Sequence, residues 1–279
     1  MRLRLPPAEV ITRQVRICLE EDIGSGDLTA GLINADAVSR VEVICREEAV
    51  ICGYAWFEEV FHQLDPDIRV EWLVPEGTRV KPGVLLCLVN GNTQALLSGE
   101  RSALNYLQTL SATATRARRY ADAVAGTGVR ILDTRKTLPG LRLQQKYAVV
   151  CGGCHNHRIG LYDAILIKEN HIQAAGSIAA ALLAAQAVDG GVEIEIEVES
   201  LADLDQALAV GARRVLLDNF SIEQLRQAVS LNAGRARLEA SGGVTLEGIR
   251  LIAETGVDDI SVGALTKDIA AVDLSMRFV

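Results

Sequence analysis

The second half of the chain alternates short β-rich runs with helical stretches, and this alternation constrains the fold more than any other feature. The last four runs are evenly spaced, by about one strand, one helix and two short loops. Strands that alternate with helices form βαβ units and a parallel sheet. Helix boundary signals agree, because Ser221 with Gln224 fits a capping box and Gly211 and Gly256 stand where helices should end. We expect strands at Val129–Thr134, Ala164–Lys168, Val192–Glu199, Arg214–Asp218, Arg237–Ala240 and Asp259–Val262.

Polar or glycine residues follow every one of these strands, as in Arg135 and Lys136 after the first and Ser241–Gly243 after the fifth. Functional groups spread over all strand ends are typical of a β/α barrel, whereas a doubly wound sheet concentrates them at one switch point. The span of about 150 residues is short for eight units, which need about 250. The predicted fold class is therefore α/β, with an incomplete β/α barrel.

The first 100 residues lack this rhythm. Val41–Cys45, Val70–Val74 and Val84–Val89 are typical of antiparallel strands, and two helices, at about Glu100–Leu110 and Ser111–Val124, should connect the halves. The boundary between the two parts of the chain is expected near residues 105–115.

Composition excludes several classes of protein. The chain has 28 Lys and Arg against 36 Asp and Glu, a formal charge of −8, which disfavours a dedicated nucleic-acid binder. No apolar run approaches the roughly 18–20 residues that span a bilayer. The start of the chain lacks the apolar segment of a signal peptide, so we expect a cytoplasmic protein whose six cysteines are mostly small buried hydrophobes.

Five cationic or titratable residues follow the first two barrel strands. They are Arg135, Lys136, His157, Arg158 and Lys168. Arginine binds carboxylates and phosphates through two parallel hydrogen bonds, while lysine supplies a mobile point charge. Such a set would repel itself unless it shared an anionic ligand; the alternative is a set of solvated loop charges.

The run Val192–Glu199 alternates strictly, with glutamates at 193, 195, 197 and 199 on one face. An edge strand with a solvated acidic face is the ordinary explanation. In the middle of a barrel, however, the glutamates would point into the lumen, where cations or a metal must compensate them. With Asp218 on the next strand, Glu197 or Glu199 would form a Mg²⁺ or sugar-hydroxyl site.

Two glycine-rich strand ends, Ser241-Gly242-Gly243 and Val262-Gly263-Ala264, stand where barrels commonly bind phosphate through backbone N–H groups. By contrast, Cys151-Gly-Gly-Cys154-His155 matches a c-type haem motif and hints at zinc or redox chemistry. Haem attachment needs export, and zinc needs more ligands than this short stretch offers. We expect neither haem nor structural zinc.

Eight ordered stretches resemble the quinolinate phosphoribosyltransferase family, from about residue 20 to the C-terminus. They are Glu21–Thr29, Ser98–Asn105, Leu132–Gly140, Asn156–Arg158, Leu166–His171, Leu216–Phe220, Glu239–Gly243 and Ser261–Thr266. The resemblance implies an N-terminal α+β sandwich domain over residues 1–110, which residues 269–279 join, and a catalytic β/α-barrel domain over residues 111–268. It also implies a homodimer in which Arg101 reaches the site of the neighbouring subunit. Two positions depart from the family pattern, since Cys154 and Ala112 stand where glycine is common.

The resemblance also implies roles for the residues singled out above. Arg135, His157, Arg158 and Lys168 would hold the two carboxylates of quinolinate, and Lys136 would help to bind phosphates. Glu197 and Asp218 would bind Mg²⁺ and the ribose hydroxyls of phosphoribosyl pyrophosphate. Ser241, Gly242, Gly243 and Gly263 would bind the 5′-phosphate, assisted by Lys267. Catalysis would rest on Lys168, Glu197 and Asp218.

The implied reaction is phosphoribosyl transfer to quinolinate with decarboxylation, as in de novo NAD biosynthesis. One alternative is a paralogue that acts on another base, such as nicotinate. Another is a non-catalytic module that senses a metal or nucleotide through Cys151, Cys154 and His155.

Overall fold

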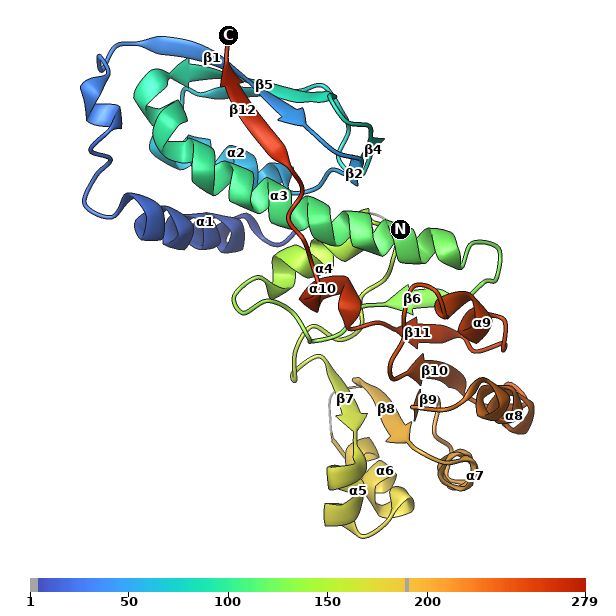
Figure 1. Ribbon diagram of the computed structural model, residues 1–279. Coiled ribbons are helices and arrows are strands. Elements are labelled where there is room, and N and C mark those ends of the chain that lie inside the picture. Colours follow the sequence, from blue (N-terminus) through green and yellow to red (C-terminus); the bar gives the residue numbers. More distant parts are fainter. Residues whose placement is uncertain (1–4, 189–190) are drawn as a thin grey trace. The chain divides into compact units, whose positions relative to one another are not determined.

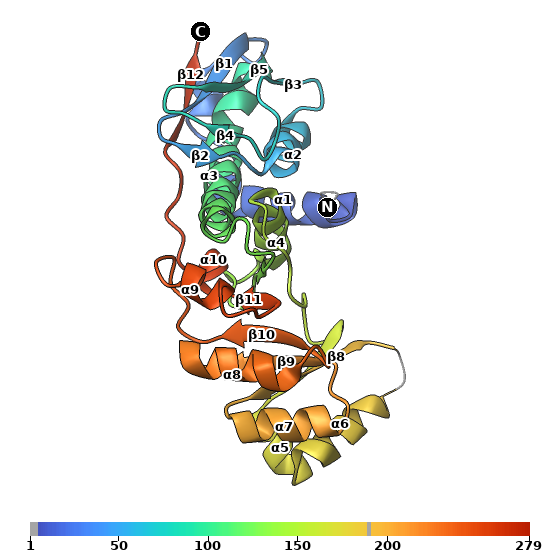
Figure 2. The same ribbon diagram turned by 90° about the vertical axis from the view of Figure 1, so that its right-hand side faces the viewer.

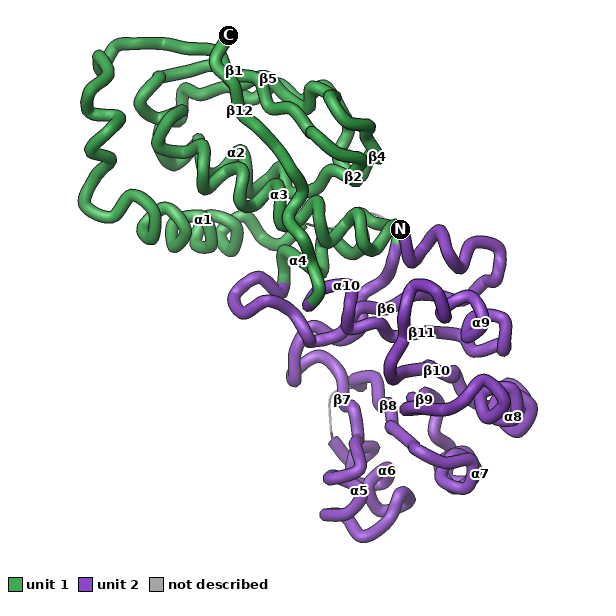
Figure 3. The backbone as a smooth tube through the Cα atoms, viewed as in Figure 1, with its two compact units in different colours: residues 1–118, 143–153, 268–279 green, residues 119–142, 154–267 purple. Residues whose placement is uncertain are grey.

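The computed structural model (Figures 1 and 2) describes residues 5–188 and 191–279. The chain divides into two compact units, which Figure 3 colours separately. Unit 1 contains residues 1–118, 143–153 and 268–279, and unit 2 contains residues 119–142 and 154–267. Residues 143–153, which lie inside the span expected for the barrel domain, thus fold with unit 1.

Unit 1 is built on an antiparallel sheet with the strand order β12-β1-β5-β3. Its strands are β1 (Val38–Cys45), β3 (Arg69–Trp72), β5 (Leu85–Asn92) and β12 (Leu274–Phe278). The short strands β2 (Ala49–Val50) and β4 (Arg79–Val80) pair separately. The three antiparallel strands predicted from the sequence are present. The C-terminal strand β12 pairs with β1, so the end of the chain completes the N-terminal sheet.

The helices of unit 1 lie on one side of this sheet, and α2 and α3 are the ones next to it (Figure 1). They are α1 (Ala8–Ile23), α2 (Tyr54–Leu64), α3 (Thr93–Ala123) and α4 (Arg142–Cys151), with a short 3₁₀ turn, η1 (Ala30–Leu32). Trp56, Phe57 and Phe61 of α2 are fully buried. The prediction of two helices meeting at Ser111 was wrong, because α3 is continuous over 31 residues. No glycine or proline interrupts it there, and the Ser111 hydroxyl accepts a hydrogen bond from the Cys52 backbone N–H (3.0 Å).

Unit 2 contains the predicted parallel sheet, with the strand order β6-β11-β10-β9-β8-β7. The strands are β6 (Arg130–Leu132), β7 (Ala164–Ile167), β8 (Glu193–Val198), β9 (Arg214–Asp218), β10 (Arg237–Ser241) and β11 (Asp259–Ser261). All six lie within two residues of their predicted bounds. Because β6 and β7 stand at the two edges of the sheet, the barrel is incomplete.

Successive helices follow the strands on the outer side of the curved sheet (Figure 1). They are α5 (Glu169–Ala175), α6 (Ile178–Gln186), α7 (Leu201–Ala209), α8 (Ile222–Asn232), α9 (Ile249–Ala253) and α10 (Ala264–Lys267). The predicted capping box of Ser221 and Gln224 begins α8. Gly211, just beyond α7, has the positive φ (+82°) that favours glycine. None of the helices in the described part of the chain has the length and apolar character of a membrane span.

Candidate active site

A cavity of about 290 Å³ lies at the carboxyl ends of the six strands of unit 2. Its lining residues are Thr134, Arg135, Lys136, His157, Arg158, Leu166, Lys168, Glu197, Leu216, Asp218, Glu239, Ser241 and Ser261. Parallel strands place all their carboxyl ends at one edge, which explains why residues scattered over the sequence meet here. A larger cavity of about 510 Å³, at the amino ends of β8 and β9, contains none of the predicted site residues.

Most of the predicted site residues meet in the smaller cavity. Those that line it are Arg135, Lys136, His157, Arg158, Lys168, Glu197, Asp218 and Ser241. Gly242, Gly243, Gly263 and Lys267 follow β10 and β11 without lining it. Arg101 is exposed on α3 in unit 1. The sequence analysis missed Thr134, Leu166, Leu216, Glu239 and Ser261.

The cavity presents positive charge that the protein leaves unpaired. Across the described residues, the side chains of Arg135 and Lys136 have no hydrogen-bond or ion-pair partner. Arg158 donates from Nη1 only to the Ala164 carbonyl (3.3 Å). Burial and the nearby charge of Arg135 lower the pKa of Arg158, as expected for two guanidinium groups that face a shared space. An anionic ligand between them would relieve this repulsion.

Two carboxylates face the same cavity. Glu197 on β8 pairs with the Lys168 ammonium, and its side chain is 12% exposed. Asp218 at the end of β9 accepts a hydrogen bond from Asn219 Nδ2 (2.7 Å). Glu199 does not line this cavity but a neighbouring acidic one, to which Glu197 also contributes, and the charge of Glu169 raises the pKa of Glu199. Of the two alternatives, Glu197 is therefore the one that lines the cavity with Asp218.

The chemistry of these donors fits Mg²⁺. Magnesium is bound through one or two carboxylates, and its remaining positions go to water and substrate phosphates. One Glu197 oxygen accepts from Lys168, and the other has no hydrogen-bond partner among residues 5–188 and 191–279. A free carboxylate oxygen beside Asp218 suits a cation that arrives with a phosphate.

The loop after β10 brings backbone close to a neighbouring strand end. Gly242 has a φ of +97°, and a Cβ there would lie 2.8 Å from the Asn219 backbone nitrogen. A side chain at Gly263 would lie 3.0 Å from Lys136 Cδ. Gly242 therefore needs glycine, whereas at Gly263 the flexible Lys136 side chain could move aside.

Beneath the cavity, an ion-pair network fills the interior of the sheet. Arg214 on β9 donates from Nε to Glu195 (2.9 Å) and from Nη2 to Glu239 (2.6 Å). Glu195 and Glu239 are 3% and 0% exposed. Asp259 on β11 is bound by Arg130 and Arg237. Glu195 and Glu197 thus point inward and cations compensate them, whereas Glu193 and Glu199 are exposed. The sequence analysis missed Arg214, Glu239 and Asp259.

The alternation of side chains along each strand could have revealed this network from the sequence. Arg214 lies four residues before Asp218 on β9, and Glu239 lies two residues before Ser241 on β10. Each therefore faces the same side of the sheet as the cavity residue that follows it.

Two domain profiles cover nearly the whole chain. Residues 27–111 match the N-terminal domain of quinolinate phosphoribosyl transferase, and residues 113–277 match its C-terminal domain. The chain belongs to the quinolinate phosphoribosyltransferase family. It is an enzyme of the transferase class.

Relatives within the family are similar over almost their full length. A Bacillus subtilis protein named probable nicotinate-nucleotide pyrophosphorylase (carboxylating) is 41% identical over 257 residues, covering 92% of this chain and 89% of the relative. The solved nicotinate-nucleotide pyrophosphorylase of Francisella tularensis is 45% identical, with a TM-score of 0.96 over 100% of this chain and 99% of that one. NadC of Streptococcus pyogenes is 36% identical, with a TM-score of 0.95 over 100% of both chains. These neighbours confirm the predicted fold class.

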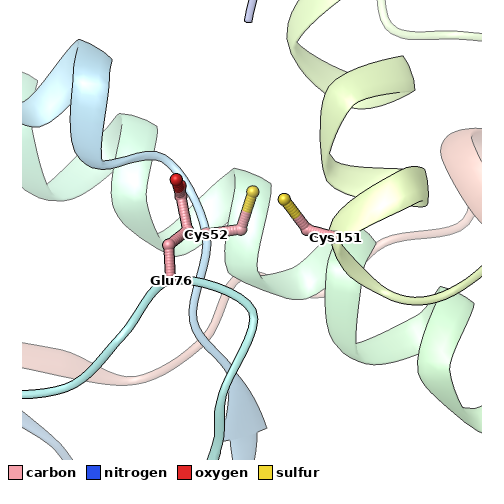
Figure 4. A group of neighbouring side chains, drawn as sticks. All are labelled: Cys52, Glu76 and Cys151. Atoms are coloured by element: carbon pink, nitrogen blue, oxygen red, sulfur yellow. The ribbon is translucent and has the colours of Figure 1, made fainter. Parts of the chain in front are cut away.

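The C-x-x-C-H stretch of this family member does not form one cluster. Cys151 ends α4 in unit 1, where its sulfur points towards that of Cys52, with Glu76 beside them (Figure 4). Glu76 accepts hydrogen bonds from the Gly53 N–H (2.6 Å) and the Tyr147 hydroxyl (2.6 Å), so its carboxylate has a structural role at the start of α2. Cys154 and His155 belong to unit 2, and neither joins a group of three possible metal ligands in the described part of the chain.

Proposed function

We propose that this enzyme transfers the phosphoribosyl group of phosphoribosyl pyrophosphate to quinolinate and removes one carboxylate. The products would be nicotinate mononucleotide, pyrophosphate and CO₂, as de novo NAD biosynthesis requires. The observation that carries the proposal is the unpaired positive charge of Arg135 and Arg158 facing the acidic pair Glu197 and Asp218 in one cavity. The name carried by the Francisella structure at 45% identity supports the same reaction.

A dicarboxylate satisfies this cavity better than a monocarboxylate. Arg135 and Arg158 each offer a planar fork for one carboxylate, and Lys168 adds a third positive charge on the next strand end. His157 also lines the cavity. A base with one carboxylate would leave one of these guanidinium groups desolvated without a partner, which is costly.

Phosphoribosyl pyrophosphate would bind at the carboxyl ends of β8, β9, β10 and β11. Glu197 and Asp218 would hold Mg²⁺ and the ribose hydroxyls. When bound, the metal would neutralise the departing pyrophosphate. The backbone after β10, at Ser241, Gly242 and Gly243, would bind the 5′-phosphate together with Gly263. Lys136 and Lys267 would add positive charge for the phosphates.

The chemistry follows from these positions. The pyridine nitrogen would attack C1 of the ribose as pyrophosphate leaves, through a transition state with oxocarbenium character. Glu197 and Asp218 would stabilise its positive charge. In the nucleotide formed by this step, which still has both carboxylates, the ring nitrogen is cationic. The electron pair of the adjacent C–CO₂ bond can therefore remain on the ring as CO₂ departs. Lys168 would then stabilise or protonate the resulting carbanion.

We further propose that the active form is a homodimer in which the partner subunit's Arg101 completes the site. Arg101→Ala and Arg135→Ala should each be inactive as pure proteins. Mixed dimers should regain part of the activity, because one of their two sites contains neither substitution. No recovery on mixing would refute a contribution of Arg101 across subunits. A cytoplasmic location stays a prediction.

End-point mass spectrometry tests the function directly. The purified protein is incubated with Mg²⁺, phosphoribosyl pyrophosphate and either quinolinate or nicotinate. We expect nicotinate mononucleotide from quinolinate alone, with none when phosphoribosyl pyrophosphate is left out. Product from nicotinate alone would keep the fold and the phosphate site but would refute the dicarboxylate role of Arg135, Arg158 and Lys168.

A further inference from the structure

The imidazole of His157 already uses both of its nitrogens within the protein. Nδ1 lies 2.7 Å from the backbone nitrogen of Arg158, and Nε2 lies 2.8 Å from Glu195 Oε2. The side chain lines the cavity but is only 12% exposed. A ring nitrogen that bound a substrate carboxylate would first have to give up one of these two partners.

The tautomer follows from the partner of Nδ1. A backbone N–H can only donate, so Nδ1 must accept and carry no proton. The ring proton therefore sits on Nε2 and is donated to Glu195. A cationic imidazolium would carry a proton on Nδ1 as well, and this proton would oppose the Arg158 N–H.

Glu195 cannot easily turn away from the histidine. Its other oxygen accepts from Arg214 Nε (2.9 Å), and the side chain is 3% exposed. The backbone of His157 is fixed in turn, because its N–H donates to Asp133 Oδ1 (2.9 Å). Glu239 Oε1 is the second carboxylate oxygen near Nε2, at 3.6 Å. Both ring nitrogens therefore lie against partners that are themselves fixed.

We propose that His157 is a positioning residue for Arg158, held by Glu195 as the neutral Nε2–H tautomer, and that it does not bind a substrate carboxylate itself. Its Nδ1 fixes the peptide N–H of Arg158, and this sets the direction from which the Arg158 guanidinium enters the cavity. The consequence for binding rests on the proposed function, whereas the tautomer does not.

Nitrogen NMR of the wild-type protein tests the tautomer without any substrate. In protein labelled with ¹⁵N-histidine at pH 8, the signals of His157 are those missing from the spectrum of His157→Gln. We expect Nε2 to be protonated and Nδ1 to be unprotonated. Glu195→Gln should disturb these signals, because an amide cannot accept from both His157 and Arg214. Glu199→Gln, at an exposed glutamate just beyond the same strand that bonds neither His157 nor Arg214 in the described residues, should leave them unchanged. A proton on Nδ1 at pH 8 would overturn the proposal.

Two substitutions of His157 then distinguish positioning of Arg158 from direct contact with quinolinate. The amide of asparagine overlays Nδ1 of histidine, so His157→Asn keeps an acceptor for the Arg158 N–H. The longer glutamine overlays Nε2 and loses that acceptor. We expect the KM for quinolinate to rise by about tenfold or more in His157→Gln and by only about threefold in His157→Asn, the scale of one hydrogen bond to a charged group. The reverse order would show direct contact through Nε2. A wild-type protein inactive on quinolinate would refute the proposed function and leave the tautomer result standing.

Discussion

Replacing Arg214 by methionine should destabilise unit 2 more than any substitution at an exposed arginine. Arg214 is the main partner of Glu239, which is fully buried, and it also binds Glu195. After the change, Glu195 keeps His157, but Glu239 keeps only a contact of 3.6 Å to the same histidine. Removing one partner of a buried ion pair costs about 3–5 kcal/mol, because it leaves an uncompensated charge. We expect a loss of this size at pH 8.

The loss should shrink as the pH falls. Burial, followed by the charge of Glu195, raises the pKa of Glu239 to about 7. A carboxyl group with a raised pKa stabilises the fold fully below its unfolded pKa, near 4.5, and loses that contribution as the pH rises towards 7. Without Arg214 the pKa should rise further, so that near pH 6 Glu239 binds a proton and removes the unpaired charge. The destabilisation of Arg214→Met should therefore be smaller at pH 6 than at pH 8.

Urea unfolding followed by far-UV circular dichroism at pH 6 and pH 8 measures this effect. Tryptophan fluorescence is unsuitable, because Trp56 and Trp72 both lie in unit 1. Arg213→Met is the matched control, because Arg213 is exposed and immediately precedes Arg214 at the start of β9. Adding Glu239→Gln to Arg214→Met should recover part of the stability at pH 8. Equal losses in the Arg213 and Arg214 variants, or no recovery in the double variant, would refute the reasoning.

Three further predictions concern the cavity. Lys168→Ala should lower kcat by far more than tenfold, because its charge lies beside the reacting groups; near-normal turnover would remove Lys168 from the mechanism. Gly242→Ala should raise the KM for phosphoribosyl pyrophosphate and lower stability by about 1–3 kcal/mol, because its Cβ would meet the Asn219 backbone at 2.8 Å; a variant with wild-type KM and urea midpoint contradicts this. Glu197→Gln should raise the Mg²⁺ concentration needed for half-maximal rate, measured by Mg²⁺ titration, and an unchanged requirement would show that Glu197 binds no metal.

The strands of unit 2 could be predicted closely because short β-rich runs alternate with helical stretches at an even spacing. The continuous helix α3 could not, since its residues around Ser111 are compatible both with a helix end and with a helix interior. What decides between them is the packing of α3 along unit 1, including the bond from the Cys52 backbone to Ser111. Local pattern alone does not contain that contact.

The charges of the site show a different limit. Sequence position correctly brought Arg135, Arg158, Glu197 and Asp218 to one cavity, because the carboxyl ends of parallel strands share an edge. Sequence position could not show that Arg214 is a structural residue and Arg135 a candidate ligand-binding one. That difference depends on which carboxylates the neighbouring strands place beside each arginine.

Pairing in the folded chain separates binding charges from structural ones. Arg214 is buried against two glutamates, so its charge is neutralised within the protein. Arg135 and Lys136 lie one layer higher, at the strand ends, and the protein provides no acid for either across the described residues. Leaving a half-buried guanidinium without a counter-charge costs stability, so such a group is expected where a ligand supplies the counter-charge. Residue type is the same in both layers, and the partners in the folded chain show which arginine belongs to the interior network and which to the anion site above it.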